Sequence, residues 1–123
     1  MKYIKIIISG GGGFIGGNLI RLLLNSNYNI LNLDKLTYAA DIKSLNVFNK
    51  YKNYQFKKID ISNYSEIYKI INDFKPDKII NLAAESHVDR SIESSKQFIK
   101  TNVEGTVNLL EASLKFYQKK KYK

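Results

Sequence analysis

Six of the seven glycines in this 123-residue chain stand between Gly10 and Gly17. The cluster follows a short β-branched run, residues 3–8, and precedes residues 15–24, where apolar side chains recur at helical spacing. Glycine allows a tight turn and lets a phosphate approach the backbone, and the following helix offers unpaired N–H groups at its N-terminus. A strand, a glycine-rich turn and a helix in this order predict a site for a dinucleotide pyrophosphate. A purely structural turn or a low-complexity stretch is the alternative.

Strands and helices are predicted to alternate along the rest of the chain. We expect strands at residues 29–33, 54–59 and 78–82, a short helix within 39–51, and longer helices over 64–74 and 95–117. Asn63 with Glu66 three residues on is typical of a helix N-terminus, and Pro76 stops that helix. The last helix carries one apolar stripe: Ile99, Val103, Val107, Leu110, Leu114 and Tyr117.

This alternation predicts an α/β fold, a Rossmann-type parallel sheet with helices on both faces and strand order 3-2-1-4. A complete sheet of this type has at least two more strands. We therefore expect residues 1–123 to form a partial NAD-binding Rossmann domain, its N-terminal half only, truncated before the fifth strand.

The composition excludes several classes of protein. Without cysteine there is no disulfide framework, no cysteine-ligated zinc and no thiol nucleophile. No apolar run could span a membrane and no secretory signal is visible, so we expect a cytoplasmic protein without a membrane partner. The net charge is +9, yet only Arg21 and Arg90 of the 20 basic residues are arginines. Because arginine reads bases and phosphates in bidentate fashion, we expect solvated lysine faces and no specific nucleic acid; a polyanion-binding surface is the alternative.

Two acidic residues follow predicted strands. Asp34 ends the second strand, where a carboxylate accepts hydrogen bonds from both hydroxyls of an adenosine ribose and repels a 2′-phosphate. This favours NAD over NADP, although Lys35 weakens the preference; a loop aspartate is the alternative. Asp60 and Ile61 follow the third strand, where the carboxylate would accept from the adenine amine and Ile61 would pack on the ring. The alternative for Asp60 is a helix cap.

Polar residues gather after the fourth predicted strand, in residues 82–92 (LAAESHVDRSI). The small Ala83 and Ala84 let a cofactor lie against the backbone, and ligands bind at this end of parallel strands. His87 is the only histidine, and a lone histidine is more often structural than catalytic.

Five segments together resemble the N-terminal part of the dTDP-glucose 4,6-dehydratases, which are extended short-chain dehydrogenases/reductases. They are residues 9–16 (SGGGGFIG), 34–39 (DKLTYA), 60–61, 82–92 and 98–106 (FIKTNVEGT), in family order and spacing. The glycine loop marks only the superfamily, whereas DKLTYA and LAAESHVDRSI are narrower. Related GDP-mannose and UDP-glucose dehydratases tend to have glutamine in place of Glu85 and differ at Arg90. The departures from the family pattern are Ser9, Gly12, Gly17 and Ser95.

The resemblance implies NAD as the cofactor, a dTDP-sugar as the substrate and a homodimer for full-length members. The cofactor contacts that it implies are Gly10, Gly13, Phe14, Ile15, Gly16, Asp34, Lys35, Leu36, Thr37, Asp60, Ile61, Leu82, Ala83, Ala84, Ser86 and Thr101. Ser86 and His87 are expected near the sugar. The implied reaction is the redox-neutral dehydration of dTDP-glucose to dTDP-4-keto-6-deoxyglucose.

The family's catalytic tyrosine, in a Tyr-x-x-x-Lys helix, and its acid–base carboxyl pair are expected beyond Lys123, with the sugar-nucleotide-binding domain. Two Tyr-x-x-x-Lys strings occur here by chance: Tyr54 starts one on a predicted strand, and Tyr117 starts the other at a helix end away from the cofactor. We assign no catalytic residue and no metal ligand, and expect the chain to be inactive alone. A sister sugar-nucleotide dehydratase or 4-epimerase and a non-catalytic NAD-binding module are the alternatives.

Overall fold

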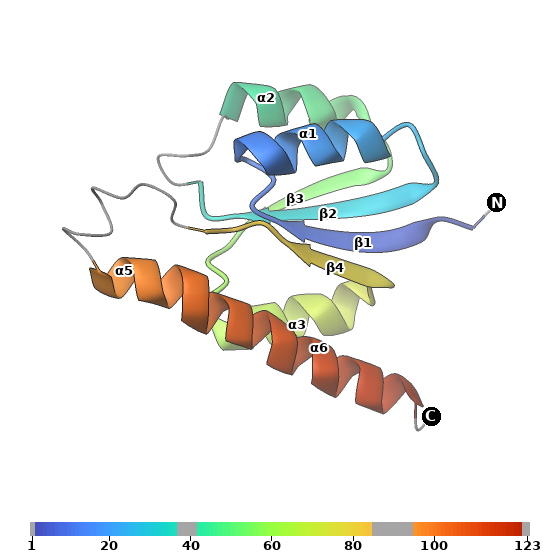
Figure 1. Cartoon of the computed structure of the whole chain (residues 1–123). Coiled ribbons are helices and arrows are strands. Elements are labelled where there is room, and N and C mark those ends of the chain that lie inside the picture. Colours follow the sequence, from blue (N-terminus) through green and yellow to red (C-terminus); the bar gives the residue numbers. More distant parts are fainter. Residues whose placement is uncertain (1, 37–41, 85–94, 122–123) are drawn as a thin grey trace. The chain divides into compact units, whose positions relative to one another are not determined.

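The computed structural model describes residues 2–36, 42–84 and 95–121, which divide into two compact units (Figure 1). Residues 1–59 and 76–83 form the first unit, and residues 60–75 and 84–123 the second. The first unit contains β1 (Ile4–Ser9), α1 (Phe14–Leu23), β2 (Tyr28–Asp34), α2 (Ile42–Asn46), the 3-10 helix η1 (Val47–Lys50), β3 (Tyr54–Lys58) and β4 (Lys78–Asn81). The second contains α3 (Tyr64–Phe74), α5 (Ser95–Ile99), the π-helical segment η2 (Lys100–Gly105) and α6 (Thr106–Lys121).

The four strands form one parallel sheet in the order β3-β2-β1-β4, which confirms the predicted order. Ile7 in β1 pairs with Leu31 in β2 and with Ile79 in β4. Because all strands run the same way, their carboxyl ends share one edge of the sheet. That edge therefore carries Ser9, Asp34 and Asn81 together.

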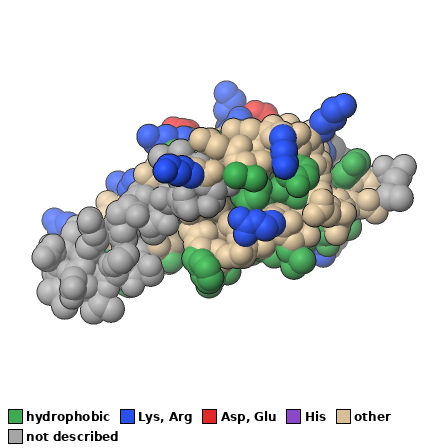
Figure 2. All heavy atoms as spheres, turned by 90° about the horizontal axis from the view of Figure 1, so that it is seen from above, with side chains coloured by type: hydrophobic (Ala, Val, Ile, Leu, Met, Phe, Trp, Pro, Cys, Tyr) green, Lys and Arg blue, Asp and Glu red, His purple; other side chains and the backbone are tan. Residues whose placement is uncertain are grey.

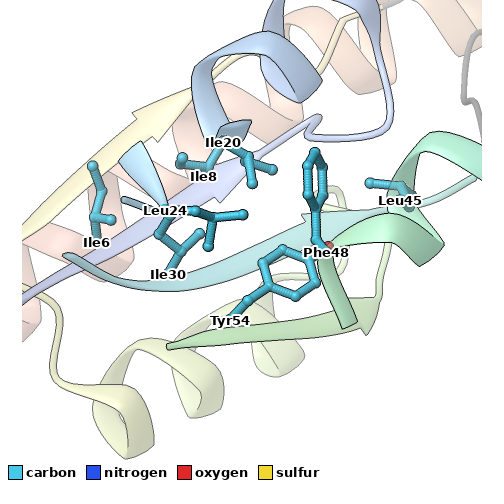
Figure 3. Close-up of a cluster of buried hydrophobic side chains, with 8 residues drawn as sticks. All are labelled: Ile6, Ile8, Ile20, Leu24, Ile30, Leu45, Phe48 and Tyr54. Carbon is cyan, nitrogen blue, oxygen red and sulfur yellow. The ribbon is translucent and has the colours of Figure 1, made fainter. Parts of the chain in front are cut away.

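One face of the sheet is covered by α1, α2 and η1 (Figure 1), and a cluster of buried side chains lies between them (Figure 3). Alternate residues of a strand point to the same face, so the strands contribute Ile6, Ile8, Ile30 and Tyr54. The helices contribute Ile20, Leu24, Leu45 and Phe48. The rings of Phe48 and Tyr54 meet edge to face with centroids 5.5 Å apart. This cluster fixes α1 over the sheet.

The apolar stripe that the sequence indicates on α1 (Ile15, Leu19, Leu22 and Leu23) is buried only in part, since Leu19 and Leu23 pack against the core cluster. Ile15 and Leu22 are 68% and 72% exposed, whereas Gly16 and Ile20 are buried. The reason is Gly16: the helix approaches the preceding loop through the position that has no side chain. The approach turns Ile20 toward the sheet.

The capping prediction for α3 is confirmed. The Asn63 side chain accepts a hydrogen bond from the Glu66 N–H at 3.3 Å, and its amide donates to Glu66 Oε1 at 2.9 Å. The helix ends at Phe74, and Lys75 turns the chain with a φ of 56° before Pro76.

The predicted last helix is observed as α5, η2 and α6 in succession, but its apolar stripe is not the buried face. The six residues of that stripe are 36–65% exposed. Residues on another face are buried instead: Thr101, Gly105, Leu109, Ala112 and Phe116. A Cβ at Gly105 would lie 2.5 Å from the Ile61 side chain, so the helix packs against Ile61 at a glycine. A pattern of apolar side chains does not include glycine and therefore does not indicate this face.

Lysine and arginine side chains are distributed over the face drawn in Figure 2 rather than gathered in one patch. Within the described residues, no helix is long and apolar enough to cross a membrane.

Candidate functional site

The loop between β1 and α1 passes close to the end of β4 at Gly10. This residue has a φ of +84°, and a Cβ on it would lie 2.5 Å from the Ala83 nitrogen and 2.6 Å from the Leu82 carbonyl carbon. A side chain here would be strained and would also collide with backbone atoms. Gly10 is therefore a requirement of the fold.

The other loop glycines fall into two groups. A Cβ on Gly16 would lie 2.2 Å from the Gly10 oxygen, and one on Gly11 would lie 2.2 Å from Asn32 Oδ1. A Cβ on Gly13 would be 3.5 Å from the Gly10 oxygen, and one on Gly17 would be 3.4 Å from the Gly11 oxygen, which are ordinary contacts. A Cβ on Gly10 or Gly16 would thus meet backbone atoms, so the fold requires glycine at both, whereas on Gly11 it would meet the Asn32 side chain and on Gly13, at the start of α1, it has room.

Asp34 lies beside this loop, as the sequence predicts. Its Oδ2 accepts a hydrogen bond from the Gly12 N–H at 2.6 Å, and its Oδ1 accepts from the Leu36 N–H at 2.7 Å. Leu36 itself has a φ of 59°, in the left-handed region. A ligand hydroxyl at Asp34 would share oxygens that already hold the loop.

The end of β4 is fixed against β1. The Leu82 N–H donates to the Ser9 carbonyl at 2.8 Å. Asn81 Oδ1 accepts from the Ser9 hydroxyl at 2.6 Å and from the Ala83 N–H at 3.1 Å. The structure thus brings Gly10, Asp34 and Ala83 to one sheet edge.

Three predicted cofactor residues belong to the second unit. Asp60 Oδ1 accepts from the Ser62 N–H at 2.9 Å and from the Ser62 hydroxyl at 2.7 Å, while Asn63 rather than Asp60 caps α3. Ile61 is buried with its side chain against Gly105. Thr101 Oγ1 accepts from Gln97 Nε2 at 3.2 Å. The roles of Asp60, Ile61 and Thr101 toward a cofactor stay predictions.

Phe14 and Ile15 lie exposed on the first turn of α1, and Ala84 is exposed after β4. Thr37, Ser86 and His87 lie outside the described residues, as do Glu85 and Arg90. The described ranges contain no cluster of His, Asp or Glu that could hold a metal ion.

Asn32, which the sequence patterns do not single out, is fully buried in β2 beside the loop. Its Oδ1 accepts from the Gly11 N–H at 3.0 Å, and its Nδ2 donates to the Tyr54 hydroxyl at 3.1 Å. The available signal was a polar residue inside the apolar run Ile30–Leu33. Tyr54 and Lys58 both lie on β3, as predicted for that Tyr-x-x-x-Lys string.

Burial raises the pKa of Tyr54 above its ordinary value of 10.0; the hydrogen bond from Asn32 opposes this, and the charge of Asp34 adds to it. The folded chain then holds this proton more tightly than the unfolded chain does. The contribution of Tyr54 to the free energy of unfolding is therefore full below the pKa of the unfolded chain and is lost as pH rises above about 10.

Replacing Tyr54 by phenylalanine should make this alkaline loss of stability smaller. Urea unfolding at about pH 9 and about pH 11 measures the loss. Tyr3→Phe, at an exposed position, is the control; equal alkaline losses in both variants would contradict the assignment.

A family model described as GDP-mannose 4,6 dehydratase matches residues 7–123. The chain belongs to this family. Among curated relatives, the dTDP-glucose 4,6-dehydratase of Neisseria meningitidis is 44% identical over 115 residues, which are 93% of this chain and 32% of that protein. The chain thus spans about a third of the length of the curated relatives it matches.

Solved structures agree on the fold. A dTDP-glucose 4,6-dehydratase from Streptomyces venezuelae, solved with NAD bound, matches with a TM-score of 0.84 and 34% identity over 92% of this chain and 36% of its own. A UDP-glucose 4-epimerase from Thermotoga maritima matches with a TM-score of 0.83 and 27% identity over 92% and 35%. The chain is therefore homologous to the N-terminal part of dTDP-glucose 4,6-dehydratases, which confirms the resemblance.

Proposed function

We propose that residues 1–123 are the NAD-binding part of a dTDP-glucose 4,6-dehydratase. The observation that carries the proposal is the joining of the glycine loop to Asp34 at the carboxyl edge of the sheet, with Gly12 N 2.6 Å from Asp34 Oδ2. This is where dinucleotides bind in such sheets. The relative from Neisseria meningitidis supports the choice of enzyme.

In this proposal the start of α1 binds the pyrophosphate through its N–H groups, from Gly13 to Gly16. The surrounding fold leaves room for a Cβ at Gly13, so packing does not explain why a glycine stands there. A close approach of the pyrophosphate does explain it, and Gly13 therefore fits this role. Asp34, Lys35, Leu36 and Thr37 surround the adenosine ribose, and Asp60 and Ile61 the adenine. Leu82, Ala83, Ala84, Ser86 and Thr101 follow the cofactor toward the nicotinamide.

NAD, when bound, would accept a hydride from the sugar and return it, which makes the dehydration redox-neutral. Ser86 and His87 would lie near the sugar. The catalytic tyrosine and carboxyl pair that the resemblance implies have no counterpart assigned in residues 1–123. A homodimer and a cytoplasmic location belong to the same proposal for the full-length protein.

A sister enzyme is the second candidate. The family description names GDP-mannose, and an epimerase has nearly the same TM-score as the dehydratase. The segments 34–39 and 82–92, which are more specific family markers than the glycine loop and include Glu85 and Arg90, favour dTDP-glucose.

The preference for NAD over NADP tests the proposal, because this preference depends on the Asp34 carboxylate. We expect calorimetric titration to give tighter binding of NAD than of NADP, because the carboxylate repels a 2′-phosphate. Asp34→Ala should weaken NAD binding at least about tenfold, as for the loss of a hydrogen bond to a charged group, and narrow the gap between the two cofactors. Asp73→Ala, at an exposed position of α3, is the control. Tighter binding of NADP by the unaltered chain would contradict the assignment.

A further inference from the structure

Two consecutive loop amides are held by two side chains of β2. The Gly11 N–H donates to Asn32 Oδ1 at 3.0 Å, and the Gly12 N–H donates to Asp34 Oδ2 at 2.6 Å. Asn32 and Asp34 are two positions apart in a strand, so their side chains point to the same face. A buried amide and a partly exposed carboxylate of β2 therefore hold the glycine loop against this strand.

Asp34 and Asn32 differ in whether a ligand can reach them. Asp34 is partly exposed and is the residue proposed to receive the ribose hydroxyls, which would compete with Gly12 for its oxygens. Asn32 is fully buried, and both ends of its amide are engaged, one by Gly11 and the other by the Tyr54 hydroxyl. A ligand at Asp34 would therefore not compete for the bond between Asn32 and Gly11.

The space around Asn32 shows that the loop is fitted to this side chain. A Cβ on Gly11 would lie 2.2 to 2.5 Å from the three terminal atoms of the Asn32 amide. Tyr54 holds the far end of the amide from β3, and its ring packs against Phe48 in the core. The amide thus contacts the core at one end and the loop at the other.

We propose that Asn32 is a positioning residue for NAD binding: it holds the Gly11 N–H so that the loop keeps its shape while Asp34 turns to the ribose. The part concerning NAD rests on the proposed function, whereas the part concerning the loop does not. Asn32 touches no cofactor in this account and acts only through Gly11.

The test compares a variant that removes both hydrogen bonds of this buried amide with one that removes only the bond away from the loop. Asn32→Leu removes the bond to Gly11 and the bond to Tyr54. Tyr54→Phe removes only the second and keeps the loop contact. We expect Asn32→Leu to weaken NAD binding about tenfold, the effect of one lost hydrogen bond, and Tyr54→Phe to weaken it less than about threefold.

The double variant Asn32→Leu/Tyr54→Phe separates positioning from stability. Because it also removes the hydroxyl that Asn32→Leu leaves buried without a partner, its urea midpoint should recover part of the loss. NAD binding should not recover. A midpoint and an affinity that rise together would overturn the positioning role.

Amide hydrogen exchange by NMR provides a readout that needs no NAD. The Gly11 amide should exchange at least about tenfold faster in Asn32→Leu than in the unaltered chain, after normalisation to the Ile30 amide, which bonds to the Asn53 carbonyl in the core. Tyr54→Phe should leave the normalised Gly11 rate nearly unchanged. An unchanged rate in Asn32→Leu would overturn the proposal. If the unaltered chain binds no NAD, the proposed function fails, and the Gly11 rate alone decides whether Asn32 holds the loop.

Discussion

Replacing Gly16 by alanine is expected to destabilise the first unit severely, whereas the same replacement at Gly13 should leave it folded. A Cβ at Gly16 would lie 2.2 Å from the Gly10 oxygen and 2.8 Å from the Gly11 Cα, and neither backbone atom can move without shifting the loop. Overpacking costs about 1–3 kcal/mol and occasionally more, and here the obstacle is backbone rather than a side chain that could rotate away. With a typical domain stability of about 5–15 kcal/mol, this loss is large.

Two further variants make this prediction specific. At Gly13 the nearest atom to a Cβ is 3.5 Å away, so Gly13→Ala should keep the unfolding transition and weaken NAD binding by crowding the pyrophosphate. Gly17→Ala lies inside α1 with its nearest atom at 3.4 Å and should be neutral or stabilising by up to about 1 kcal/mol. Urea unfolding by circular dichroism gives the stability, and calorimetry gives the affinity. A Gly16→Ala chain as stable as Gly17→Ala would contradict the steric account.

The second large effect concerns turnover: a polypeptide of residues 1–123 should form no 4-keto-6-deoxy sugar from dTDP-glucose. The chain matches about a third of the length of its dehydratase relatives, and no catalytic residue is assigned within it. In the described sheet β4 is an edge strand, and an exposed edge offers N–H and C=O groups to another chain. We therefore also expect this polypeptide to self-associate or to be marginally stable.

Mass spectrometry of the sugar product and light scattering of the protein check this pair of expectations. Supplying the remaining two-thirds of a family member, in cis or as a separate chain, should restore solubility and turnover together. A monodisperse 123-residue monomer that forms the product unaided would contradict this account, which assigns catalysis to the part of the related dehydratases that this chain does not match.

Most element positions could be predicted because they depend on short-range patterns, and the strand order followed from the strand–helix alternation and the rules for parallel sheets. The β-branched runs, the Asn63 cap and the break at Pro76 are local signals, and all three agree with the structure. The buried face of the last helix could not be predicted, and that of α1 only in part. Each packs through a glycine, Gly16 in α1 and Gly105 at the end of η2 just before α6, where a Cβ would collide. Hydrophobic periodicity gives no weight to a residue without a side chain, so it does not indicate a face that packs through glycine.

The same limit applies to the candidate site. The pairing of Asp34 with the glycine loop was predictable because fixed spacing along a strand–turn–helix unit implies it. The role of Asn32 was not, since it depends on which loop amide lies above a particular strand position. The spacing of the glycines also could not separate those that the fold requires, Gly10 and Gly16, from Gly13.

Amide NMR of the isotope-labelled chain during NAD titration tests the central claim most directly, because it reports both binding and its location. The account predicts saturable shifts concentrated at the amides of Gly11 to Gly16 and of Asp34 to Leu36. Absence of saturable shifts, or shifts confined to the lysine-rich end of α6, would contradict it.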